Sequence, residues 1–200
     1  HEDKKNNNID WDAREAQLVS LLDKYRSRNG SYDVVVPGSG GKDSFYVAHM
    51  LKYKYNMHPI TCTFAPNMYT SWGHNNFTNW INSGFSNYLY TSNGLVHNLI
   101  TRLAIDKILH PFQPWILGQK NFPVKFARNL NISLIFYGDD PAEYGNREDE
   151  CDEMMNEKFF SQEVGKEIYI AGQPKNKLKK DLKLEESDFE PYVPISIKEF

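Results

Sequence analysis

The sequence predicts an α/β fold in three layers, with a parallel β-sheet covered by helices on both faces. Two observations lead to this prediction. Short apolar segments alternate along the chain with longer segments whose apolar residues recur at helical spacing, which is typical of βαβ units joined by right-handed crossovers. The segment 34–36 consists of three consecutive valines, as expected of a strand that is buried on both faces.

The elements can be assigned in order along the chain. Residues 1–8 are polar and are expected to fray, and Asp10 can then cap a helix over 14–25. The helix ends before Asn29-Gly30. The elements predicted beyond this point are a strand over 32–36, a helix over 42–55, a strand over 59–64, a helix over 74–83, a strand over 87–91, helices over 95–109 and 115–130, and a strand over 133–137.

The composition favours a globular cytoplasmic protein. A chain of 200 residues is long enough for one domain with an appendage. A net charge of −3 argues against a broadly basic nucleic-acid-binding protein. The sequence has no apolar run long enough for a membrane span and no apolar segment near its start typical of a signal peptide. Its two cysteines cannot form a disulfide framework or a four-cysteine zinc site, which favours a reducing compartment.

A glycine-rich loop lies between the predicted strand at 32–36 and the helix that follows it. Glycines let the backbone approach a ligand closely, and the N–H groups at the start of a helix attract anions. The loop is not a Walker A motif, which would need glycine at Val36 and serine or threonine at Asp43. It is not a dinucleotide-binding fingerprint either, because Asp43 stands where the third glycine or alanine would be. Phosphate is the expected ligand of the loop residues, which are Ser39, Gly40, Gly41, Lys42, Asp43 and Ser44.

The segment 39–44 resembles the Ser-Gly-Gly-x-Asp-Ser loop of the PP-loop ATP pyrophosphatases. The resemblance implies an adenine nucleotide alpha-hydrolase-like fold, which is Rossmann-like, and ATP as cofactor. Enzymes of this superfamily cleave ATP between its α- and β-phosphates and adenylate an oxygen of the second substrate. In such a reaction Lys42 and Asp43 would be catalytic, because Lys42 would stabilise the leaving pyrophosphate and Asp43 would bind Mg²⁺. All six residues of the segment would contact ATP.

Three further residues are predicted to contact ATP because of their place in the sheet. Ligands of parallel sheets bind outside the carboxyl ends of the strands. Thr63 and Phe64 end the second predicted strand and could bracket the adenine, although a core and turn role is the alternative. Gly138 follows the strand at 133–137, so the topology is expected to bring it beside the phosphate loop.

Two longer blocks resemble the N-acetyl sugar amidotransferases of bacterial surface-polysaccharide, lipopolysaccharide and nonulosonic-acid pathways. They are 110–119, His-Pro-Phe-Gln-Pro-Trp-Ile-Leu-Gly-Gln, and 136–145, Phe-Tyr-Gly-Asp-Asp-Pro-Ala-Glu-Tyr-Gly. The resemblance covers about residues 9–145. It implies a ligase that replaces the acetamido oxygen of an N-acetyl sugar by ammonia-derived nitrogen, with release of AMP and pyrophosphate. It also implies that ammonia comes from a separate glutaminase subunit, which works with a cyclase-like subunit. From the composition we expect no membrane partner, and the net charge argues against a nucleic-acid partner.

Side chains in these two blocks are the candidates for the second substrate. Gln113, Trp115 and Gln119 could contact the sugar, since amides bond hydroxyls and an indole stacks on a pyranose face, but a packed helix start would use the same residues. Glu143 is a further candidate for substrate binding. Where the family has Gly-Glu-Asn, this chain has Gly-Asp-Asp at 138–140. Asp139 is therefore the candidate for holding Mg²⁺ or assisting ammonia, and a solvated turn that caps a helix is the alternative.

The predicted domain organisation has three parts. Residues 1–30 form a polar lead and a helix, 31–145 the ATP-binding domain, and 146–200 a partial appendage or lid. The basic stretch at 175–180 is either a solvated face or part of a lid that meets phosphates. Family members usually carry a cysteine-containing segment before the first helix, which could bind zinc, and a further carboxyl-terminal stretch. Since the sequence begins at His1, we expect it to be a fragment.

Two other functions agree with the phosphate loop. A tRNA-modifying PP-loop enzyme would share the loop, although the Cys-x-x-Cys pair common in thiolating members is absent from the sequence. A nucleotide-binding subunit without catalysis would share it as well. Salt-sensitive tRNA binding would favour the first alternative, and ATP binding without pyrophosphate release would favour the second.

Overall fold

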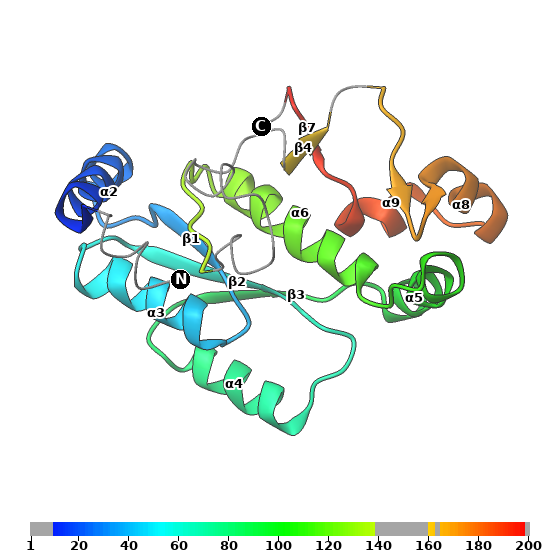
Figure 1. Cartoon of the computed structure of the whole chain (residues 1–200), viewed down its shortest axis with the longest axis horizontal. Helices are drawn as coiled ribbons and strands as arrows, with labels where there is room; N and C mark the ends of the chain where they lie inside the picture. Colours follow the sequence, from blue (N-terminus) through cyan, green and yellow to red (C-terminus); the bar gives the residue numbers. More distant parts are fainter. Residues whose placement is uncertain (1–9, 139–159, 163–164, 199–200) are drawn as a thin grey trace.

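The structure is a computed structural model of the chain, and it describes residues 10–138, 160–162 and 165–198. Its first part alternates helices and strands (Figure 1). The elements of this part are α2 (Trp11–Tyr25), β1 (Val34–Pro37), α3 (Lys42–Tyr53), β2 (Pro59–Phe64), α4 (Ser71–Ile81), β3 (Asn87–Tyr90), α5 (Gly94–Ile108) and α6 (Gln113–Asn129). The predicted helices and strands of this part therefore form, with bounds that differ from the prediction by up to three residues.

The carboxyl-terminal part consists of short elements. They are β4 (Ser161–Gln162), β5 (Tyr169–Ile170), β6 (Gln173–Pro174), α8 (Lys175–Leu182), α9 (Glu186–Phe189), the 3₁₀ turn η3 (Glu190–Tyr192) and β7 (Ile195–Ser196). Parallel β4 and β7 form one pair, and antiparallel β5 and β6 form another. None of the helices in the part of the chain that the structure describes is long and apolar enough to cross a membrane.

The central sheet is parallel and has the strand order β1-β2-β3, so the α/β class is confirmed. The fourth strand, predicted over 133–137, is reduced to one parallel bridge between Val35 and Ile135. The backbone explains why the ladder stops. Pro37, the next residue of β1 that would donate toward this side, has no N–H group, and the N–H of Asp33 donates to His58 O instead, at 3.2 Å.

Successive residues of β1 contribute to separate apolar clusters. Val34 and Val36 belong to a cluster with Leu22 of α2 and Trp80 of α4, whereas Val35 packs in another cluster with residues of β2 and α6. Successive side chains of a strand point to opposite faces, and in Figure 1 α3 and α4 lie on one side of the sheet while α6 lies on the other. The three consecutive valines are fully buried, as the sequence predicts.

Helix α2 begins three residues earlier than predicted, and Asp10 caps it as expected. The Asp10 carboxylate accepts a hydrogen bond from the N–H of Ala13 at 2.9 Å. Helix α4 also begins three residues earlier than the sequence predicts, because Thr70 caps it through a bond from Gly73 N–H at 3.0 Å. In both helices a polar side chain satisfies one of the first N–H groups, which have no partner within the helix.

The carboxyl-terminal part packs on α5 and α6 through a core of its own. Its cluster includes Ile100 of α5 and Phe189 of α9, both fully buried. Tyr192 lies at its centre, where its hydroxyl is 2.7 Å from His97 Nδ1 and its carbonyl accepts a bond from Asn121 Nδ2 at 2.9 Å. The lysines of α8 contact acidic neighbours: Lys175 and Lys179 pair with Glu186, and Lys177 pairs with Asp181.

Candidate functional site

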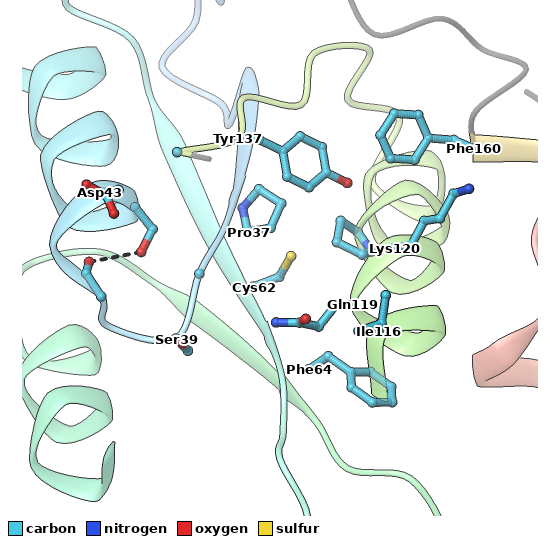
Figure 2. Close-up of a pocket in the computed structure, with 15 residues that line it drawn as sticks. Pro37, Ser39, Asp43, Cys62, Phe64, Ile116, Gln119, Lys120, Tyr137 and Phe160 are labelled. Carbon is cyan, nitrogen blue, oxygen red and sulfur yellow. Dashed lines mark hydrogen bonds between the residues drawn. The ribbon is translucent and has the colours of Figure 1, made fainter. Parts of the chain in front are cut away.

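A cavity of about 340 Å³ opens at the carboxyl ends of β1 and β2 (Figure 2). This is the edge at which parallel sheets bind ligands, and the volume lies within the range of small-molecule sites. In Figure 2 the glycine loop and the start of α3 lie on one side of the cavity and α6 lies on the other. The lining residues are Pro37, Gly38, Ser39, Gly41, Asp43, Ser44, Cys62, Phe64, Ile116, Gln119, Lys120, Pro123, Tyr137, Gly138 and Phe160.

Two glycines of the loop are required by packing. A Cβ on Gly38 would lie 2.6 Å from the Cβ of Ser44. Gly40 has a φ of +90°, and a Cβ there would lie 2.3 Å from the backbone oxygen of Asn76 in α4. Both contacts are far inside van der Waals distance, so a side chain at either position would push the loop away from the elements that support it. The loop is therefore held in one conformation by close packing.

Gly41 has no such structural requirement. Its φ of −67° is accessible to any residue, and a Cβ there would meet no atom within 4 Å. Gly41 lines the cavity and precedes the first turn of α3, which no side chain caps. The first N–H groups of a helix have no partner within the helix and carry a partial positive charge. A glycine at this point leaves the backbone accessible to an anion.

Asp43 and Lys42 form an ion pair at the mouth of the cavity. Lys42 Nζ lies 2.6 Å from the Asp43 carboxylate, and the two side chains are 88% and 52% exposed. Asp43 lines the cavity, whereas Lys42 is absent from its lining. The structure thus places Asp43, the predicted metal ligand, in the cavity wall. It places the Lys42 ammonium group outside the cavity, and a change of the lysine rotamer would alter its distance from the cavity.

Gly138 closes the site against the start of α3. A Cβ on Gly138 would lie 2.7 Å from the backbone nitrogen of Ser44, so only glycine fits there. The structure brings the end of the segment 134–138 next to the phosphate loop, as the sequence predicts. Asp139 and Glu143, the other candidates of this block, lie outside the described residues.

The opposite wall is formed by α6, with Ile116, Gln119, Lys120 and Pro123 along its cavity side. Lys120 is half-buried, and this burial lowers the pKa of its ammonium group because the charged form loses hydration. Phe160, from the carboxyl-terminal part, completes this side of the cavity. Its ring stacks on Tyr137 with 5.6 Å between ring centroids.

Phe64 and Cys62 reach the cavity from alternate positions of β2. A Cβ on Gly118 would lie 2.2 Å from the Phe64 ring, so the glycine allows α6 to pack directly on it. Cys62 is a buried free thiol, and burial raises its pKa. A thiol in this environment stays protonated and acts as a small apolar surface.

Besides Lys42, four predicted residues that the structure describes lie outside the cavity lining. Thr63 is buried, and its hydroxyl donates to Gly38 O at 2.6 Å. The side-chain oxygen of Gln113 accepts a bond from Ala171 N–H at 3.1 Å, which ties α6 to the carboxyl-terminal part. The indole N–H of Trp115 is buried, and no partner is found for it among the described residues. Gly40 also stays outside the lining, behind the loop.

Sequence reasoning named seven of the lining residues and missed the others. Ile116 and Pro123 had a signal, because they lie one helical turn before and after Gln119, and Lys120 lies one turn after Ile116. Cys62 had one as well, since it is two residues from Phe64 on the same strand. Phe160 had none, because it is far from the three blocks in sequence.

Asp43 is the candidate metal ligand among the described residues that line the cavity. No group of three or more metal-binding side chains occurs in residues 10–138, 160–162 and 165–198. A Mg²⁺ ion bound to phosphates needs only one or two protein carboxylates, so Asp43 fits such an ion. A comparison of the sequence with protein-family models gives no match, and a comparison with curated proteins gives no significant match.

Proposed function

We propose that this chain is an ATP-dependent amidotransferase of the PP-loop type, acting on an N-acetyl sugar in the cytoplasm. The enzyme would transfer AMP from ATP to the acetamido oxygen and release pyrophosphate. Ammonia would then attack the activated carbon, and AMP would leave with the former amide oxygen, which yields an acetamidino group. The fold would be a small form of the three-layer, adenine nucleotide alpha-hydrolase-like architecture.

The observation that carries this proposal is the convergence of three separate sequence blocks on one cavity. Residues of the blocks 39–44, 110–119 and 136–145 line it together, although the blocks are far apart in the chain. The topology of a parallel sheet brings the glycine loop and Gly138 to the same edge. A shared ligand would explain why the block in α6 presents Gln119 to the same opening.

The chemistry of the loop supports ATP as one ligand. The start of α3 and the hydroxyl of Ser39 offer donors to phosphate oxygens. The hydroxyl of Ser44 donates to Gly41 O at 3.1 Å and would have to turn away from it to reach a phosphate. Asp43 would hold Mg²⁺ on the phosphates, and Lys42 would move toward the pyrophosphate as negative charge develops on it. Lys120 supplies a second positive charge, from the α6 wall of the cavity.

The test is a reaction with the chain, ATP, MgCl₂, ammonium chloride and a panel of N-acetylated sugars. We expect AMP and pyrophosphate to form in equal amounts, and one sugar to change in mass by the difference between oxygen and an NH group. Asp106→Ala, which removes an exposed carboxylate from α5, serves as the matched control for changes at Asp43. Glutamine should not replace ammonium, because the glutaminase is expected on another subunit.

The other candidate functions give different results in the same experiment. A tRNA-modifying enzyme would release pyrophosphate with tRNA and with no sugar of the panel. A nucleotide-binding subunit would bind ATP and release no pyrophosphate under any of these conditions. Either result would contradict the sugar amidotransferase.

A further inference from the structure

A chain of polar groups, in which the two threonines are buried, connects the glycine loop to β3, an edge strand of the sheet. Thr63 Oγ1 donates to Gly38 O at 2.6 Å, and Gly38 is the first residue of the loop. The amide nitrogen of Asn87 lies 3.2 Å from Thr63 Oγ1 and 2.9 Å from Thr61 Oγ1. Thr61 and Thr63 are buried, and neither lines the cavity.

The direction of each hydrogen bond follows from which groups carry a hydrogen that they can donate. A carbonyl oxygen can only accept, so Thr63 must give its single hydroxyl hydrogen to Gly38 O. Thr63 Oγ1 can therefore only accept from Asn87, and the side chain of Asn87 must present its NH₂ group here. By the same reasoning Thr61 donates to Ser86 O at 3.0 Å and accepts the other amide hydrogen.

The bond at Gly38 fixes the loop at its root. The N–H of Gly38 donates to Cys62 O at 2.9 Å, so β2 holds both polar backbone groups of this residue. The next part of the loop is held by Gly40, which packs on α4. A ligand that binds loop N–H groups gains affinity when those groups are already in position, because less ordering entropy is lost on binding.

We propose that Thr63 and Asn87 are positioning residues for the phosphate loop, and that their hydrogen-bond relay sets the orientation of the loop N–H groups for ATP phosphates. The consequence for ATP rests on the proposed function, whereas the consequence for the loop does not. Thr63 thus acts on the nucleotide through Gly38, without contact to the adenine.

The neighbouring threonine provides a matched control. Thr61 and Thr63 are on the same strand, both are buried, and both accept from the same amide. Only Thr63 donates to the loop, because the hydroxyl of Thr61 donates to Ser86 O at the start of β3. Thr61→Val and Thr63→Val therefore remove the same chemical group, and a general loss of stability should be similar in both.

The experiment compares Thr63→Val, Thr63→Ser, Thr61→Val and Asn87→Asp in the full chain. Hydrogen–deuterium exchange of the segment 38–44 is measured without ligand, and ATP affinity is measured by calorimetry with MgCl₂. We expect faster exchange in the loop and about tenfold weaker ATP binding for Thr63→Val, the size of one lost hydrogen bond. Thr63→Ser should restore both values, and Thr61→Val should leave both within about twofold of the wild type.

Asn87→Asp tests the direction of the relay. A carboxylate has no hydrogen to donate and would attract the Thr63 hydroxyl away from Gly38 O. We expect it to speed exchange in the loop as Thr63→Val does. Equal exchange in the Thr61 and Thr63 valine variants, or unchanged exchange in Thr63→Val, would overturn the proposal. A wild-type chain that does not bind ATP would overturn the proposed function, while the exchange data would still decide on the relay.

Discussion

The loop wall of the cavity, residues 38–44, differs from the α6 wall in the way the chain builds it. The loop wall is one continuous segment whose shape depends on backbone contacts: Gly40 against α4, Gly138 against Ser44, and Gly38 bound to Thr63. The α6 wall consists of side chains one helical turn apart, joined by Phe160 from the carboxyl-terminal part. The backbone of the loop wall is shaped by close packing, whereas the α6 wall consists of longer side chains that can change rotamer.

Because of this difference, we expect the two walls to bind different parts of the ligands. A rigid backbone wall suits phosphates, which have the same shape in every nucleotide. A wall of side chains can vary from one enzyme to another and so can select the second substrate. The following predictions test this comparison, beginning with the largest expected effect.

The strongest test of the rigid wall is a pair of glycine substitutions. Gly40→Ala should lower the free energy of unfolding by about 2 kcal/mol or more, because it combines a positive φ with a backbone clash. Gly41→Ala should lower it by about 1 kcal/mol or less, since its Cβ meets open space and only the cost of alanine at a helix N-cap remains, and it should still weaken ATP binding. Urea unfolding and calorimetry measure both. Equal stability losses in the two variants would contradict the packing argument.

The next largest effect is expected for the Lys42–Asp43 ion pair of the loop wall. Asp43→Asn should lower the rate of AMP formation by about a hundredfold or more, because it removes the carboxylate proposed to hold Mg²⁺. Lys42→Met should have a smaller effect, about tenfold, since Lys42 is outside the cavity lining. The Asp106→Ala control should behave as the wild type. A larger loss in Lys42→Met than in Asp43→Asn would reverse the roles given to the ion pair.

A moderate effect is expected on the α6 wall. Lys120→Met should raise the KM for an anionic substrate about tenfold, and Lys120→Arg should restore most of the loss because the charge is retained. Steady-state kinetics with ATP and the sugar varied in turn would show which of them meets Lys120. If both KM values are unchanged in Lys120→Met, then this wall takes no part in recognising charge.

The smallest effect is expected at His97 of α5, and it concerns how the stability of the protein depends on pH. Burial lowers the pKa of His97, so the folded protein binds fewer protons at this imidazole than the unfolded chain does. The contribution to stability is present above the ordinary imidazole pKa of about 6.5 and decreases as the pH falls below that value. His97→Gln should therefore flatten the loss of stability on acidification. Denaturant unfolding across this pH range measures it, and an unchanged slope would show that His97 does not titrate on unfolding.

The same two regions show how far sequence reasoning reaches. The loop wall could be predicted because its residues are contiguous and their types follow from the chemistry of phosphate binding. Ile116, Pro123 and Cys62 could have been inferred from helix and strand periodicity once Gln119 and Phe64 were named. Phe160 could not, because its place depends on long-range packing of the carboxyl-terminal part, which short and weakly periodic elements do not reveal.

The reduction of the fourth strand to one bridge has a local cause that propensity rules overlook. In the sequence, Pro37 indicates the end of a strand. In the structure it is the last residue of β1 and pairs with β2. Its missing N–H matters only on the other side, where the segment 134–136 pairs with Val35. A prediction that treats each segment alone does not include the effect of Pro37 on the segment 134–136, which is distant in sequence.

The packing of the carboxyl-terminal part on α5 and α6 also bears on the order in which the protein is made. Ribosomes release the chain from its amino end, so α5 and α6 emerge before the residues that cover Ile100 and Asn121. Until Tyr192 has been synthesised, these helices expose apolar surface, and Phe160 lacks its contact with Ile195 until that residue follows. The glycine loop can thus be shaped early, whereas the cavity that contains it is completed only after the carboxyl-terminal part has been made.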